Sequence, residues 1–97
     1  MDHDVVRARR FELVDDEGRT RAVLTAEADT HLVGIHIANA AGRPAASMGL
    51  DPDQDFPLIT LRDPGGDQAR LSLTILPSGE PLILMRDNEG HERNIEV

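Results

Sequence analysis

Three aspartates in the segment Asp51-Pro-Asp-Gln-Asp55 have the alternating spacing with which a calcium-binding loop begins. Hard divalent cations favour such clusters of carboxylate oxygens. A complete loop of the EF-hand type would also place glycine at its sixth position and glutamate at its twelfth, where this chain has Phe56 and Arg62. We therefore expect a solvated acidic connector and no metal-binding residues.

The histidines are the other candidate metal ligands or general bases. They are His3, His31, His36 and His91, and no two have a spacing that places them on one face of a strand or helix. Only His36 falls inside an expected strand. It lies between the inward-facing Ile35 and Ile37, so its side chain should point the other way. We expect a surface or interface residue there, and the sequence supports no zinc site.

Residues for covalent or phosphate chemistry lack the context that this chemistry requires. Ser47, Ser72 and Ser78 are not part of a G-x-S-x-G nucleophile elbow. The pair Gly65-Gly66 lies in an expected turn and opens no phosphate-binding helix. The chain has no cysteine, which excludes thiol catalysis, thiolate metal sites and disulfides. The sequence therefore predicts no catalytic residues, no cofactor-binding residues and no enzyme activity.

What does recur in the chain is a β-hairpin about 24 residues long. Each copy has an aspartate or asparagine followed three residues later by glycine. These turn residues are Asp15/Gly18, Asn39/Gly42, Asp63/Gly66 and Asp87/Gly90. Two apolar residues precede each turn, as Phe11/Leu13, Ile35/Ile37, Ile59/Leu61 and Ile83/Met85. The turn pattern is typical of a type I turn with a bulge, so each copy should be two antiparallel strands.

The repeat predicts an all-β fold, an antiparallel meander of about eight short strands in a single domain over residues 5–97. Residues 1–4 are expected to be a disordered N-terminal segment. The expected strands are 5–14, 20–25, 34–38, 43–48, 58–62, 69–75, 82–86 and 92–97. Pro44 cannot donate a hydrogen bond to a neighbouring strand, which would place its strand at an edge or on the looser side of the sheet. Arg70 falls one position later in its copy than Arg21 does in the first, which predicts one extra residue in the third turn. For the connector 26–33, a short helical turn is an open alternative.

Apolar residues occupy both sides of the expected strands. Those that should face away from the main apolar positions are Val14, Val23, Leu58, Leu82 and Leu84. The chain has only two aromatic residues, both phenylalanine, so a core built from one chain would be small. We therefore expect an open or partly closed sheet that self-associates, with a small closed barrel as the alternative.

Charge limits the partners of the protein. The formal net charge is −8, and a phosphate backbone requires a basic face, so no nucleic acid partner is expected. All ten basic residues are arginine. Glu12 and Arg21 lie at similar distances from the first turn and are expected to pair across the strands, with Arg62, Arg86 and Arg93 at comparable positions.

Neither a membrane span nor a signal peptide is expected. No apolar run approaches the ~20 residues that cross a bilayer. The start, Met1–Asp4, has neither the basic region nor the apolar segment of a secretion signal. We expect a cytoplasmic protein with no membrane partner.

The repeat can be written D-x-x-G-x-x-R-A-x-L. The first copy contains it as Asp15, Gly18, Arg21, Ala22 and Leu24, and the last copy contains part of it as Asp87, Gly90 and Arg93. Over residues 10–97 the chain resembles uncharacterised bacterial tandem β-hairpin repeat proteins and, more distantly, YD-type hairpin repeats, although no copy here contains tyrosine. The resemblance implies a structural repeat and brings no activity, cofactor or catalytic residue with it.

The sequence therefore predicts a non-enzymatic structural or protein-interaction module that forms a homo-oligomer. At least one outer strand, such as the one ending in Asn94–Val97, should contribute to the contact, because an unprotected strand edge normally has a partner. The alternative is a small-molecule binding protein that holds its ligand in a barrel mouth or at a subunit interface.

Overall fold

The structure is a computed structural model that describes residues 4–27, 33–51 and 53–96. Within these ranges the chain forms eight strands and no helix. The strands are β1 (Arg10–Val14), β2 (Thr20–Thr25), β3 (Val33–Ala38), β4 (Pro44–Leu50), β5 (Pro57–Arg62), β6 (Ala69–Ile75), β7 (Pro81–Arg86) and β8 (Glu92–Glu96).

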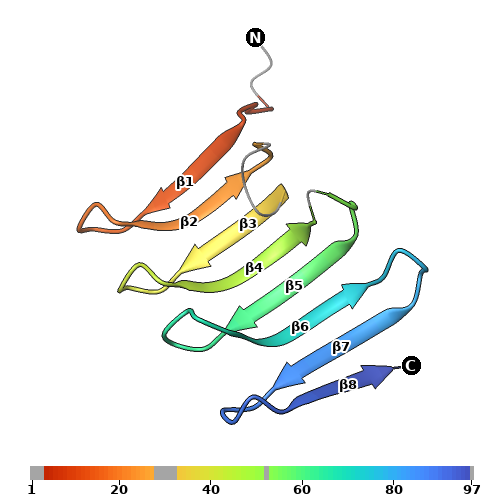
Figure 1. Ribbon diagram of the computed structural model, residues 1–97. Coiled ribbons are helices and arrows are strands. Elements are labelled where there is room, and N and C mark those ends of the chain that lie inside the picture. The colour runs from red at the N-terminus through yellow and green to blue at the C-terminus, as the bar shows by residue number, and fades with distance from the viewer. Residues whose placement is uncertain (1–3, 28–32, 52, 97) are drawn as a thin grey trace.

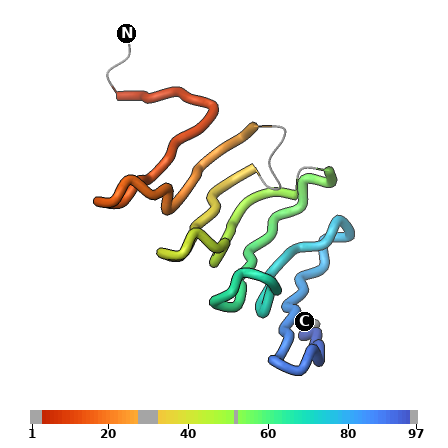
Figure 2. Tube along the Cα trace, turned by 60° about the vertical axis from the view of Figure 1, so that its left-hand side comes forward, coloured from red at the N-terminus to blue at the C-terminus, as the bar shows by residue number. Residues whose placement is uncertain are grey.

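All eight strands belong to one antiparallel sheet, and their order in the sheet is their order in the sequence (Figure 1). The strands β1 and β8 form opposite edges, so the sheet is open. Figure 2 shows the same strands as a single twisted layer. The predicted all-β meander of hairpin repeats is thus confirmed, in its open form.

Each predicted turn is closed by hydrogen bonds within a few residues. In the first turn, the N–H of Gly18 donates to the carbonyl oxygen of Asp15 at 3.0 Å, and Gly18 has φ +80°. The carboxylate of Asp15 accepts the N–H groups of Glu17 and Arg19 at 2.9 and 3.0 Å. Asn39 and Asp87 make the same set of bonds in their turns. The aspartate or asparagine and the glycine together determine where each hairpin reverses.

The third turn contains the extra residue that the sequence predicts. The N–H of Asp63 donates to the carbonyl oxygen of Gln68, five residues ahead, whereas Asp15 bonds to Arg19, four residues ahead. Gly66 still adopts positive φ, at +74°.

Three expectations about the strands are corrected or untested. β1 begins at Arg10 and not at Val5, because its partner β2 ends at Thr25. Beyond this pair, the N–H of Ala26 still donates to the carbonyl oxygen of Arg9. The strand that contains Pro44 is the fourth of eight and therefore interior. Pro44 is its first residue and lies beside a bulge, where a missing donor is tolerated. The expectations for residues 1–3 and 28–32 lie outside the described residues.

The turn carboxylates make the stability of the hairpins dependent on pH. The N–H of His91 donates to the Asp87 carboxylate, as does that of Glu89, and these bonds hold the pKa of Asp87 below its usual value. A lowered pKa contributes stability that is complete above the unfolded-state pKa and is lost as the pH falls through the folded-state pKa.

We expect Asp87→Ala to lower the melting temperature at pH 7, because two backbone donors lose their acceptor. Asp87→Asn should melt close to wild type at pH 7, since Asn39 makes the same two bonds in the second turn. The asparagine variant should also lose less stability than wild type between pH 5 and pH 2. Thermal melts across this range test this, and an equal loss in all three proteins would contradict it.

Candidate functional site: the apolar face

One face of the sheet is apolar from the first strand to the last. Residues that pair directly across antiparallel strands point to the same face. One row of such pairs is Phe11, Leu24, Ile35, Met48, Ile59, Leu73, Ile83 and Ile95. A second row beside it is Leu13, Ala22, Ile37, Ala46, Leu61, Leu71, Met85 and Arg93. We call the surface formed by these two rows the apolar face.

The apolar face is largely open to solvent. Leu13 is 66 % exposed, Met48 55 % and Leu24 51 %. No large side chain among the described residues is fully buried. A single-layer sheet has no second layer of its own to cover this surface, whereas stable domains pack two layers around a core.

The size of the molecule supports the same conclusion. Its accessible surface is 7389 Å², against about 5,500 Å² for a folded monomer of 10.6 kDa. The excess is about 1,900 Å². The radius of gyration of 15.5 Å likewise exceeds the about 12–13 Å of a compact chain of this length. The isolated sheet therefore exposes the surface that another layer would normally cover.

Half of the apolar face contains a groove. It lies over β5 to β8, has a volume of about 310 Å³, and its floor and walls are almost entirely aliphatic and proline side chains. The lining residues on the apolar face include Ile59, Leu73, Ile83 and Ile95. Such a surface suits an apolar side chain, and Thr74 is its one lining residue with a polar side chain, whose hydroxyl donates to the Pro57 carbonyl oxygen.

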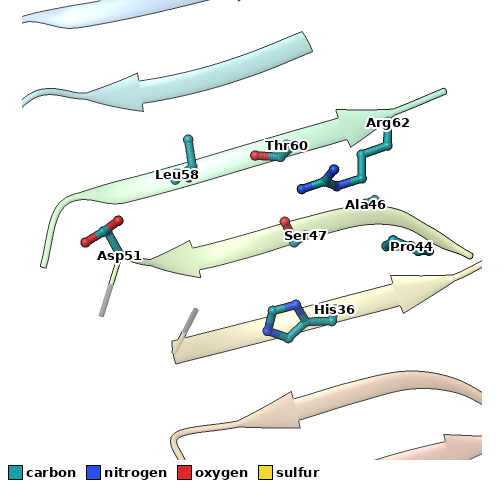
Figure 3. Close-up of a pocket in the computed structure, with 8 residues that line it drawn as sticks. All are labelled: His36, Pro44, Ala46, Ser47, Asp51, Leu58, Thr60 and Arg62. Atoms are coloured by element: carbon teal, nitrogen blue, oxygen red, sulfur yellow. The ribbon is translucent and has the colours of Figure 1, made fainter. Parts of the chain in front are cut away.

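The opposite face is polar at its centre. His36, Ser47 and Thr60 pair directly across β3, β4 and β5 and point to this face. They line a hollow of about 460 Å³, with Asp51 at one end and Arg62 at the other (Figure 3). The hydroxyls, imidazole and guanidinium could bind a small polar ligand. Thr60 is only 7 % exposed, while the hollow as a whole opens to solvent.

The acidic connector has a structural explanation. The carboxylate of Asp51 accepts the N–H groups of Asp53 and Gln54, both at 2.9 Å, and Asp55 has φ +60° in the same turn. The first carboxylate of the calcium-like motif therefore closes the turn between β4 and β5. Within the described residues, no three histidine, aspartate or glutamate side chains gather closely enough to hold a metal ion.

The arginine of the repeat motif links neighbouring hairpins, and the predicted pairing of Glu12 with Arg21 is wrong. Arg21 lies at a bulge in β2. Its guanidinium contacts the Asp15 carboxylate at 3.5 Å and donates to the Ala38 carbonyl of the next hairpin at 3.1 Å. Glu12 accepts from Arg10 instead. The bulge rotates Arg21 toward the turns, so it cannot face the carboxylate across the strands.

Arg70 repeats this arrangement in the second half of the sheet. It contacts the Asp63 carboxylate of its own turn at 3.3 Å and donates to the carbonyl of Asp87 in the next hairpin. The second hairpin has Ala45 at this position, and there the Asn39 amide donates to the Pro64 carbonyl at 3.0 Å. Arg21, Asn39 and Arg70 are therefore structural residues, each of which links its hairpin to the next one at the turn end of the strands.

The last strand differs from the other returning strands in register. The first three hairpins each have a bulge after the turn, but β7 and β8 pair without one, as Met85 with Arg93 and Arg86 with Glu92. A shift of one residue moves every side chain to the other face. Ile95 therefore completes the first apolar row, and Arg93 lies on the apolar face. The predicted equivalence of Arg93 to Arg21 fails for this reason.

The remaining sequence candidates are dispersed. Ser72 lies on β6 beside Thr60, and Ser78 lies in the turn between β6 and β7. His91 contacts the Asp87 carboxylate at 3.2 Å in the last turn, while His3 and His31 lie outside the described residues. These three residues therefore lie in different parts of the sheet, on β6, in the turn that follows it and in the last turn.

None of the described segments is a helix that could cross a bilayer. The described residues present two surfaces with recognisable chemistry, which are the apolar face and the polar hollow. Comparison of the chain with protein-family models, curated proteins and solved structures finds no match.

Proposed function

We propose that this protein is a non-enzymatic interaction module of the cytoplasm that self-associates through its apolar face. The observation that carries the proposal is the pair of apolar rows that crosses all eight strands and is exposed in the isolated chain. Contiguous exposed apolar surface of this extent usually marks an interface.

The outer strand β8 contributes to the proposed contact through its side chains. Ile95 is 46 % exposed and lies at the end of the first apolar row. In this proposal the last strand contributes its apolar side chain on the face of the sheet as well as its backbone edge. Covering the face also gives the chain the second layer that it lacks.

The protein is expected to have a solution mass of at least two 10.6 kDa chains at micromolar concentration. Its melting temperature should rise with protein concentration, because association stabilises the folded state by mass action. Analytical ultracentrifugation and melts over a hundredfold concentration range measure both. A mass of one chain with a concentration-independent melt would overturn the proposal.

The second candidate function is binding of a small polar molecule, and the polar hollow on the opposite face supports it. In an open sheet this hollow takes the place of a barrel mouth as the ligand site. Arg62 at one end suits a carboxylate, and Asp51 at the other suits an amine. The same mass measurement separates the two candidates, since a well-folded monomer would favour this one.

A further inference from the structure

We infer that the apolar face is covered by a second copy of the same chain, packed sheet against sheet, with the two-fold axis running along the strands. This inference rests on the proposed function and specifies its partner and geometry. In this arrangement β1 and β2 of one copy lie over β7 and β8 of the other.

The exposed area fits a second copy. The chain exposes about 1,900 Å² more than a compact monomer of its mass. This excess is spread over both faces and the edges of the sheet, and covering half of it on each of two copies would bury about 1,900 Å² in total, which is the size of a stable interface. Two sheets of this kind pack about 10 Å apart, as in a β-sandwich.

The two ends of the apolar face differ, because only one of them contains the groove. Phe11 and Leu24 lie in the first row at the β1–β2 end and are 43 % and 51 % exposed. The groove of about 310 Å³ lies at the other end, with Ile83 and Ile95 among its lining residues. A two-fold axis along the strands places Phe11 and Leu24 of one copy over Ile95 and Ile83 in the groove of the other copy. An axis across the strands would place groove over groove and leave both unfilled.

Side-chain size in the second row supports the same axis. With the axis along the strands, Ala46 of one copy lies over Leu61 of the other, and Ala22 lies over Met85. Small residues then face large ones, which lets the two layers interdigitate. With the axis across the strands, the large residues of β5 to β7 would face one another.

Charge is compatible with two copies of an acidic chain meeting at this face. The two apolar rows contain a single charged residue, Arg93, although the whole chain has a net charge of −8. In the inferred dimer Arg93 lies over Leu13 of the other copy, next to the acidic turn of Asp15, Asp16 and Glu17. Its aliphatic stem can cover the leucine while the guanidinium reaches these carboxylates.

Cross-linking of turn residues tests the axis directly, because the chain contains no cysteine. Glu17 lies in the first turn and Glu89 in the last, with side chains 72 % and 80 % exposed, so Glu17→Cys and Glu89→Cys should keep the fold. With the axis along the strands, the first turn of one copy lies over the last turn of the other, about 10 Å away.

The two variants are mixed, unfolded and refolded together, and treated with a short bis-maleimide cross-linker. We expect strong cross-linking in the mixture. Each variant alone should cross-link at least tenfold less, because like turns are then separated by six strand spacings, about 29 Å. Both variants must first show the wild-type mass.

Each outcome has one meaning. A dimer that cross-links in the Glu17→Cys sample alone, or in no sample, overturns the face-to-face geometry but leaves self-association standing. A wild-type mass of one chain overturns self-association itself. A dimer that cross-links only in the mixture supports the inferred axis.

Discussion

Replacing Met48 with lysine is expected to reduce the protein to the mass of a single chain and to lower its melting temperature by about 10 °C or more. Met48 lies at the centre of the first apolar row and is 55 % exposed in the isolated sheet. If a second layer covers it, the ammonium group becomes a buried, unpaired charge, which costs about 3–5 kcal/mol. For a chain of this size, about 1 kcal/mol shifts the melting temperature by roughly 4–8 °C.

Val14→Lys is the matched control for this prediction. Val14 is also an apolar strand residue, 52 % exposed, but it alternates with Leu13 and points to the opposite face. Its replacement should leave the mass unchanged and shift stability by no more than about 0.5 kcal/mol, as is usual for a surface position. Equal effects of Met48→Lys and Val14→Lys on mass and melting would show that the apolar face is not the interface.

Gly34→Ala is expected to destabilise the protein by about 3 kcal/mol or more, which is the upper end for an overpacked site. Gly34 pairs directly with Gly49 between β3 and β4. A Cβ atom on Gly34 would lie 2.2 Å from the carbonyl oxygen of Met48 and 2.6 Å from the Cα of Gly49. These are backbone atoms of the neighbouring strand, so the two strands would have to separate.

Two further glycine substitutions make this a graded test. Gly65→Ala adds the same methyl group where it meets only the Asp67 and Asp63 carboxylates, at 3.3 and 3.5 Å, so it should cost little. Gly18→Ala meets no atom within 4 Å but has φ +80°, which should cost roughly 1 kcal/mol. Urea unfolding of the three variants measures the series. Equal free energies of unfolding for Gly34→Ala and Gly65→Ala would show that β3 and β4 do not approach each other closely at Gly34.

The features that depend only on residues close in the sequence could be predicted. The turn residues, the extra residue of the third turn and the two-sided alternation of strands such as β5 all followed from the 24-residue repeat. Each turn is closed by bonds between residues at most five apart, as between Asp63 and Gln68. Alternation with a period of two places Leu58 and Ile59 on opposite faces whatever their partners are.

The wrong predictions concern residues whose position depends on the neighbouring strand. The strand of Pro44 was expected at an edge or on the looser side of the sheet because proline lacks a donor, but a bulge at the start of β4 accommodates it inside the sheet. The pairing of Glu12 with Arg21 was inferred from equal distance to the turn. The bulge in β2 breaks that symmetry and directs the arginine to the next hairpin.

The candidate site was only partly visible in the sequence. The period-two alternation of apolar residues predicted the rows of the apolar face. The groove over β5 to β8 could not be foreseen, because its shape depends on how side chains from four strands pack beside one another. The polar hollow combines residues from three strands, His36, Ser47 and Thr60, none of which belongs to a recognisable motif.

By itself the sequence determined the repeat, the turns and the alternation of faces, because hydrogen bonds across a few residues and the geometry of an extended chain are local. The tertiary structure alone decided the register of β8, which brings Ile95 and Arg93 onto the apolar face. It also decided the close approach of Gly34 to Gly49 and the open, uncovered state of the sheet. These features depend on pairing between whole strands, where a shift of one residue or one bulge changes every contact that follows.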